Sequence, residues 1–363
     1  MAHAGATPPM LRQLRHDVWA TEQLIGYCRG LKPDQLDLTV PGTYGSIRRT
    51  LAHIVSSDEG YLVRLLGALF HEPPFRANDE ATLDDLARHV GHVKDGVERL
   101  FSRGDVDGDR LITDTPLRRP DQPRFEMNAW APLTQFVHHG SDHRAQINTT
   151  LSAHGIDPPD LQVWPYAMEL GEPRDQIRKG HTPEMSTPPM LRQMRHDVWA
   201  TKKLIDHCRK LTNEQLALTV PGTYGSIRAT LVHIVAADER YLRRFMQMPE
   251  PVMDEDTNGE ATLDEIAKHL QHVNDGVEKL FSGTNLDPDR VIRDARRRNP
   301  ADPPMLITSW VLLNQFAHHG SDHRAQIGTI LGAHGVETAD IDVWAYGSEL
   351  DAVKEETKSR VPA

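Results

Sequence analysis

Cysteine is scarce in this chain. Only Cys28 and Cys208 occur among 363 residues, so a disulfide framework and a cysteine-rich metal site are both excluded. Long apolar runs that could cross a membrane are also missing. The first residues, MAHAGATPPM, lack the charged start and apolar core of a signal peptide, which predicts a cytoplasmic protein.

An excess of basic residues is missing as well. Lysine and arginine number 41 against 52 aspartates and glutamates, which gives a formal net charge of −11. A general nucleic-acid binder needs a basic face to displace counterions, so that class is disfavoured. Hydrophobic residues make up 38% and charged residues 26%, values typical of a folded globular protein. We expect a small-molecule substrate, with neither nucleic acid nor membrane as partner.

The sequence contains two copies of one domain. Adding 180 to a residue number finds the counterpart: PPMLRQ recurs from Pro8 at Pro188, and LTVPGTYGSIR recurs from Leu38 at Leu218. A period this long indicates a duplicated domain rather than a solenoid of short repeats. The expected division is a first copy at 1–170, a polar linker at 171–187, a second copy at 188–350 and a polar tail at 351–363.

Each copy has the hydrophobic periodicity of four helices. In the first copy they are expected at residues 9–30, from Ser46, from Thr82 with Asp85 completing a capping box, and at 128–154 before Gly155. Thr262 and Glu265 repeat the capping box in the second copy. No convincing strand pair is visible, and a proline-rich loop spans 115–124. The fold class is therefore all-α, with a four-helix bundle in each copy.

Histidine is abundant, with 20 residues, and one histidine motif occurs twice. HHGSDHRAQI begins at His138 and returns at His318. On a helix it places His139 one turn before His143 on the same face, and His319 likewise before His323. Two imidazoles at this spacing can bind one metal ion. The alternative is a solvated polar face.

A third ligand is expected from a neighbouring helix. His53 and its counterpart His233 are the best candidates, although a helical wheel sets His53 away from the apolar stripe, among small residues that suit a pocket wall. Alternative ligands with lower priority are His16, His89 and His92, and their counterparts His196, His269 and His272. A polar helix face explains those six more simply.

The motifs resemble the DinB-like (DinB/YfiT) family of four-helix-bundle metalloenzymes. The likeness rests on GSIRRTLAHIV with His53, on HHGSDHRAQI, on HDVWA in the first helix, and on the endings DLQVWPY and DIDVWAY. It implies two tandem up-down-down-up bundles and a divalent metal held by His53, His139 and His143, and by His233, His319 and His323. Ala145 and Ala325 stand where a common family variant has glycine. Relatives often pair as dimers, so the resemblance implies a pseudo-dimer within one chain.

Three neutral ligands with an open fourth position are typical of a catalytic site. Zinc or nickel would suit imidazole ligands. Such an ion lowers the pKa of a bound thiol or water, and no HExxH motif supplies a protease-type base. Some relatives are thiol-dependent S-transferases or isomerases, so the leading hypothesis is a metal-dependent transferase that uses a low-molecular-weight thiol. The alternatives are a metal-hydroxide hydrolase or lyase-like enzyme, and a non-catalytic scaffold in which metal joins helices.

Further residues are expected to support the site. Asp58 and Arg144 fall on apolar stripes, so a buried salt bridge is predicted between them and between Asp238 and Arg324. The alternative is that Arg144 binds a substrate carboxylate. Gln146 and Gln326 are expected either to orient a ligand histidine or to touch substrate. The candidate pocket-lining aromatic residues, for which simple packing is the alternative, are Trp19, Tyr44, Trp164, Tyr166, Trp199, Tyr224, Trp344 and Tyr346.

Overall fold

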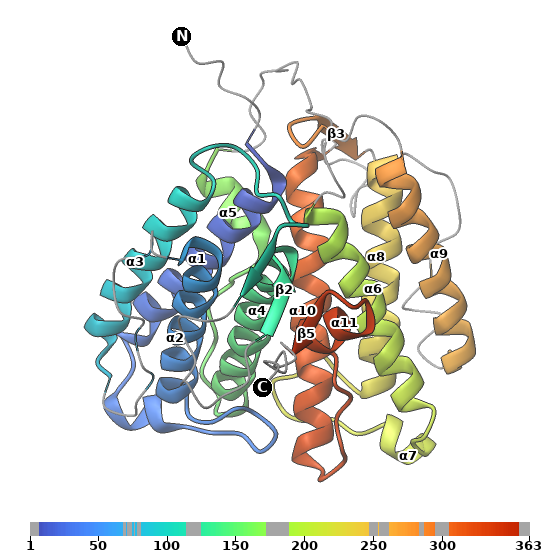
Figure 1. Cartoon of the computed structure of the whole chain (residues 1–363). Helices are drawn as coiled ribbons and strands as arrows, with labels where there is room; N and C mark the ends of the chain where they lie inside the picture. The colour runs from blue at the N-terminus through green and yellow to red at the C-terminus, as the bar shows by residue number, and fades with distance from the viewer. Residues whose placement is uncertain are drawn as a thin grey trace, which may run out of the picture.

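The computed structural model describes most of the chain. It covers residues 7–67, 70, 75, 77, 81–113, 125–171, 189–246, 253, 261–282, 287–294 and 305–355. The predicted loop at 115–124 and the linker residues 172–187 lie outside this part. Both halves are mainly helical, which confirms the all-α prediction (Figure 1). No helix in the described ranges is long and apolar enough to cross a membrane.

Four long helices form each half. In the first half these are α1 (Pro9–Cys28), α2 (Ile47–Leu66), α3 (Leu83–Leu100) and α4 (Trp130–Ala153), with a short η1 (Pro33–Asp37) and a short α5 (Val163–Glu169). In the second half they are α6 (Pro189–Cys208), α8 (Ile227–Met246), α9 (Leu263–Ser282) and α10 (Ser309–Ala333), with α7 (Asn213–Leu216) and α11 (Val343–Glu349) as short helices.

The predicted helix starts are confirmed by their caps. The Ser46 hydroxyl accepts a hydrogen bond from the Arg49 N–H at 3.3 Å, at the start of α2. Thr82 and Asp85 form the capping box of α3. Thr262 and Glu265 make the same reciprocal bonds before α9. These contacts satisfy backbone N–H groups that a helix start leaves unpaired, so they fix where α2, α3 and α9 begin.

Short strands are present, contrary to the prediction. In the first half β1 (Leu111–Thr113) pairs antiparallel with β2 (Phe125–Asn128), and in the second half β3 (Val291–Asp294) pairs with β4 (Met305–Thr308). The expected polar tail also begins with a strand, β5 (Val353–Glu355), which pairs with β2 of the other half. Three or four residues are too few to show an alternating pattern in the sequence.

The halves meet along α4 and α10, which lie side by side in the middle of the molecule (Figure 1). Ser141 Oγ lies 3.2 Å from His318 Nδ1, and Ser321 Oγ lies 3.3 Å from His138 Nδ1, so the contact is nearly symmetric. The short C-terminal helices cross over: α5 packs on α10, and α11 packs on α4. Each half thus helps to bury the helix of the other half that carries the HHGSDHRAQI motif, α4 or α10.

Each half also has its own apolar core between its helices. Cys28 and Cys208 are fully buried there as free thiols. Burial raises the pKa of each thiol to about 12. Both cysteines therefore act as small apolar side chains rather than as nucleophiles or metal ligands.

Candidate metal centre

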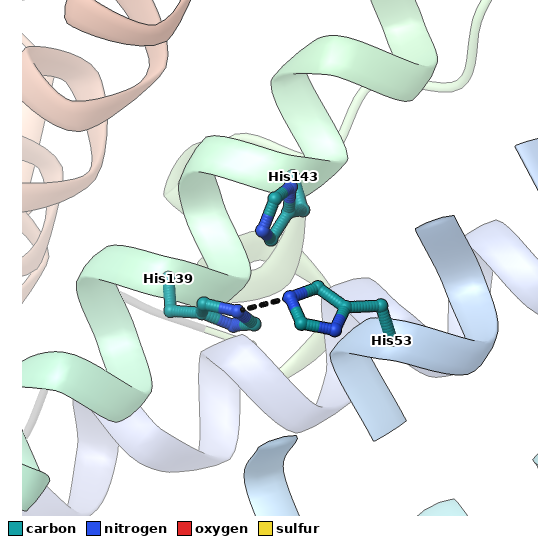
Figure 2. A group of neighbouring side chains, drawn as sticks. All are labelled: His53, His139 and His143. Carbon is teal, nitrogen blue, oxygen red and sulfur yellow. Dashed lines mark hydrogen bonds between the residues drawn. The ribbon is translucent and has the colours of Figure 1, made fainter. Parts of the chain in front are cut away.

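Three histidines converge in the first half. His53 extends from α2 toward His139 and His143 on α4 (Figure 2). The Nε2 atoms of His53 and His139 lie 3.0 Å apart, and the centroids of the His139 and His143 rings lie 4.5 Å apart. One ring nitrogen from each residue lies within 4.8 Å of the other two. The i, i+4 spacing on α4 thus places two imidazoles opposite the third.

The second half repeats this geometry. His233 on α8 faces His319 and His323 on α10, and the Nε2 atoms of His233 and His319 lie 3.0 Å apart. The ring centroids of His319 and His323 lie 4.5 Å apart, as in the first half. The structure therefore brings together the six histidines that the sequence gave as the preferred ligands, as two separate groups of three.

The donor set fits a divalent ion. A tetrahedral zinc ion with Zn–N bonds of about 2.0–2.1 Å separates its ligand nitrogens by roughly 3.3–3.4 Å. The Nε2 atoms of His53 and His139, 3.0 Å apart, are close to this separation. Burial, with a smaller effect of His143, lowers the pKa of His53 to about 4. Burial also lowers the pKa of His143 to about 4 and that of His139 well below its usual value. All three rings are thus neutral near pH 7, the form that binds metal.

Gln146 connects the ligand His143 to the loop before α2. Its Oε1 lies 3.3 Å from His143 Nδ1 and accepts a hydrogen bond from the Tyr44 N–H at 2.8 Å. Its Nε2 donates to Asp142 Oδ2 at 2.8 Å. Because Gln146 Oε1 can only accept, it favours a proton on His143 Nδ1 and leaves the lone pair on Nε2 for a metal.

The second copy keeps the same arrangement, with Gln326 beside His323 and the Tyr224 N–H. The contacts favour the orienting role over the substrate-binding role that the sequence left open for both glutamines.

The sequence comparison agrees with this geometry. A profile of the DinB family matches residues 5–175 and again residues 185–356. The chain belongs to the DinB family. No curated protein matches it with significance. The tandem match confirms the resemblance to a duplicated DinB domain, and the family together with the histidine geometry is compatible with a divalent metal in each half.

Two tyrosines border each histidine group of this DinB chain. The Tyr44 ring stacks on His53 with centroids 4.1 Å apart, and Tyr224 stacks on His233 at 4.0 Å. Tyr44 is 42% exposed, so it lies at the mouth of the site. Tyr61, two helical turns after His53, lies 5.8 Å from the His139 ring and was missed by the sequence analysis. Its spacing on α2 is the signal that could have found it.

The remaining predicted pocket aromatics pack elsewhere in this DinB fold. The Trp19 and Tyr166 rings pack at a tilt with centroids 5.3 Å apart, and the Trp199 and Tyr346 rings do so at 5.1 Å. His16 and His196, two of the lower-priority ligand candidates, belong to these two clusters. Their Nε2 atoms hydrogen-bond to the carbonyls of Leu161 and Ile341.

The last two tryptophans are half-buried. Trp164 packs against the apolar core of the second half. Trp344 packs against the core of the first half and lies 6.3 Å from the Tyr61 ring. The contacts of Trp19, Trp164, Tyr166, Trp199, Trp344 and Tyr346 thus fit the packing alternative.

The predicted partner of Arg144 was wrong. Asp58 and Arg144 are both buried as expected, but Arg144 forms its bidentate salt bridge with Asp17 on α1, with one bond of 3.0 Å to Oδ2. A Cβ at residue 140 of α4 would lie 2.6 Å from the same carboxylate, so Gly140 permits this approach. A helical wheel shows which residues are buried, but not which neighbouring helix they face.

The second half has the same pairing, with Arg324 bound to Asp197 instead of the predicted Asp238. Burial raises the pKa values of Asp58 and Asp238 well above normal, and the neighbouring carboxylate, Asp17 or Asp197, adds to this rise. Burial thus favours the neutral, protonated form of these two acids, while Asp17 and Asp197 form the ion pairs with Arg144 and Arg324.

Proposed function

We propose that each half binds one divalent ion through its three histidines, and that the chain transfers a low-molecular-weight thiol to a small electrophile. The observation that carries this proposal is the donor set. Three neutral imidazoles leave both positive charges of the ion uncompensated, which favours an anionic fourth ligand such as a thiolate. An ion bound there lowers the pKa of a thiol or water toward 7. Zinc and nickel both suit these ligands.

Residues of the chain would hold the reactants in place. Gln146 keeps His143 in one tautomer, and the Tyr44 ring covers one face of His53. The Arg49 guanidinium lies 5.6 Å from the centroid of the Tyr44 ring, at the exposed edge of the site. A carboxylate on the thiol or on the electrophile would find a charged partner there. We assign Arg49 to substrate binding in the first half.

The two sites are not equivalent under this proposal. The second half has Ala229 at the position of Arg49, and Arg240 at the position of Gly60. Burial is the main cause that lowers the pKa of His319, and the charge of Arg240 makes a smaller contribution. Each site thus has a positive charge on a different part of its wall, so the proposal includes two sites with different substrate preferences. A cytoplasmic location, where thiols are kept reduced, is part of the same proposal.

Metal-hydroxide hydrolysis is the weaker alternative. Among the described residues, no carboxylate belongs to either group of three histidines. Asp142 is the nearest acid on α4, and its Oδ2 lies 3.9 Å from His143 Nδ1 rather than on the Nε2 side. Within the described part of the chain, therefore, no carboxylate is placed to activate water at the open position, whereas a thiol needs no such base once its pKa has fallen.

Cobalt substitution tests the proposal. A free thiol added to the Co²⁺-loaded chain is expected to produce a sulfur-to-cobalt charge-transfer band, which a His139→Ala, His319→Ala variant lacks. Thiol consumption with small electrophiles then follows turnover. Ester hydrolysis without thiol would favour the hydrolase instead. Metal binding without any spectral response to thiol would favour the hypothesis of a non-catalytic scaffold.

A further inference from the structure

A second cluster of possible metal ligands lies between α2 and α3 of the first half. It consists of Glu59 on α2 and of His89 and His92, one turn apart, on α3. His89 Nδ1 lies 2.7 Å from Glu59 Oε1, and His92 Nδ1 lies 3.8 Å from the same oxygen. One ligand atom from each of the three residues lies within 4.8 Å of the others.

The carboxylate of this cluster is held in place and aimed at both rings. The Glu59 side chain is fully buried, and its Oε2 accepts a hydrogen bond from the Phe75 N–H. Oε1 is left to face the two imidazoles. The His89 imidazole forms a hydrogen bond with this oxygen. His92 Nδ1 is buried without a hydrogen-bond partner in the described part of the chain, because 3.8 Å is too long for such a bond.

The second half contains the same cluster in a changed setting. His269 Nδ1 lies 2.8 Å and His272 Nδ1 lies 3.7 Å from Glu239 Oε1. Glu239 Oε2 accepts a hydrogen bond from the Met253 N–H at 2.6 Å. The neighbours differ: Gly91 and Lys94 of the first copy are replaced by Gln271 and Asn274, yet the three possible ligands remain.

We propose that Glu59, His89 and His92 form a second divalent-metal site, and that Glu239, His269 and His272 form its counterpart. An ion between the three residues would give His92 Nδ1, which is buried without a hydrogen-bond partner among the described residues, a ligand contact. Two imidazoles and one carboxylate are a donor set for zinc and its first-row neighbours. The backbone bond to Oε2 orients the carboxylate, as outer contacts of metal ligands commonly do.

This site is separate from the three-histidine centre. Glu59 follows His53 by six residues on α2, which places the two side chains about 120° apart around the helix. His53 faces α4, whereas Glu59 faces α3. The His92 side chain is 31% exposed and that of His272 is 53% exposed, so the ion would keep open positions toward solvent. Bound metal would join α2 to α3 and to the backbone at Phe75.

Zinc stoichiometry in the full-length chain tests this proposal. After equilibrium dialysis against Zn²⁺, the native chain is expected to hold about four ions. A His92→Gln, His272→Gln variant is expected to hold about two, and it keeps the Glu59–His89 and Glu239–His269 hydrogen bonds that support folding. The matched control is His154→Gln, His334→Gln, because those exposed histidines hydrogen-bond to the carbonyls of Thr39 and Thr219 and, in the described ranges, belong to neither kind of cluster. The control should hold four ions.

A second measurement separates the two kinds of site. The His139→Ala, His319→Ala variant is expected to show a Zn²⁺-dependent rise in melting temperature, which disappears when His92→Gln and His272→Gln are added. Two ions in the native chain, unchanged by His92→Gln and His272→Gln, would overturn the proposal. Loss of the three-histidine sites alone would leave it standing, since the two clusters share no ligand.

Discussion

The Nε2 atoms of His53 and His139 face each other at 3.0 Å, although 86 positions separate the two residues in the chain. A hydrogen bond between them uses one proton and one lone pair, whereas a metal ion uses the lone pairs of both. Because burial keeps the two rings neutral, the second arrangement needs no change in charge state near pH 7. The packing of α2 on α4 thus brings the ligand nitrogens of the two helices together.

Replacing Gln146 tests how the ligand histidine is oriented. In a Gln146→Ala variant His143 loses the acceptor at Nδ1, so metal affinity of the first half is expected to fall about 10- to 100-fold. Competition with a chromophoric chelator measures this, in a His319→Ala background that removes the second centre. Asn148→Ala is the control, since the Asn148 side chain, among the residues that the structure describes, donates to the Pro159 carbonyl at 3.5 Å and to no ligand histidine. An unchanged affinity would contradict the orienting role.

Replacing Arg49 tests the substrate-binding role. In the same His319→Ala background, Arg49→Ala is expected to raise the KM for a carboxylate-bearing thiol about 10-fold with little change in kcat, the pattern of a lost binding contact. Arg48→Ala is the matched control, because Arg48 pairs with Asp37 instead. A fall in kcat at constant KM would show that Arg49 acts in the reaction rather than in binding.

The buried ion pairs predict a difference between two neighbouring acids. Asp17→Asn removes the negative charge that pairs with the buried Arg144 guanidinium. Breaking a buried ion pair in this way lowers the free energy of unfolding by about 3–5 kcal/mol. Asp58→Asn should cost about 1 kcal/mol or less, because burial raises the pKa of Asp58 and so favours the neutral carboxyl, which an amide resembles. Urea denaturation of both variants checks this. Equal losses, or a larger loss for Asp58→Asn, would restore the pairing that the helical wheel suggested.

Acid should destabilise the fold through His16 and His196. Burial is the main cause that lowers the pKa of each to about 3 in the folded chain, with a further effect of Arg144 or Arg324. The unfolded chain, with pKa near 6.5, binds the proton first, so stability is complete above about pH 6.5 and is lost as the pH falls. At pH 5 the loss is about 2 kcal/mol for each histidine.

Urea denaturation in chelator at pH 7 and pH 5 measures this loss. In a His16→Gln, His196→Gln variant, whose glutamines can still donate to Leu161 and Ile341, the difference between the two pH values should shrink by about 4 kcal/mol. If the native chain and the variant lose the same stability, other groups dominate acid unfolding.

The sequence predicted the elements of the site better than their surroundings. The i, i+4 spacing of His139 and His143 and the duplication were readable directly, because a helix fixes which of its own residues share a face. His53 was harder to predict as a ligand, because the helical wheel set it away from the apolar stripe. A ligand at the polar edge of a pocket is expected in that position. The Asp17–Arg144 pair, the crossing of β5 to β2, and the Glu59 cluster depend on which elements become neighbours. Periodicity within one helix carries no such information.

The most direct test of the central claim is the metal content of chain purified without added metal and without an affinity tag. His139→Ala and His319→Ala are each expected to remove about one ion per chain, and the double variant about two. That result would establish one three-histidine centre in each half. A metal content that is the same in the native chain and in both variants would contradict the account. So would three-histidine groups that take up neither zinc nor nickel.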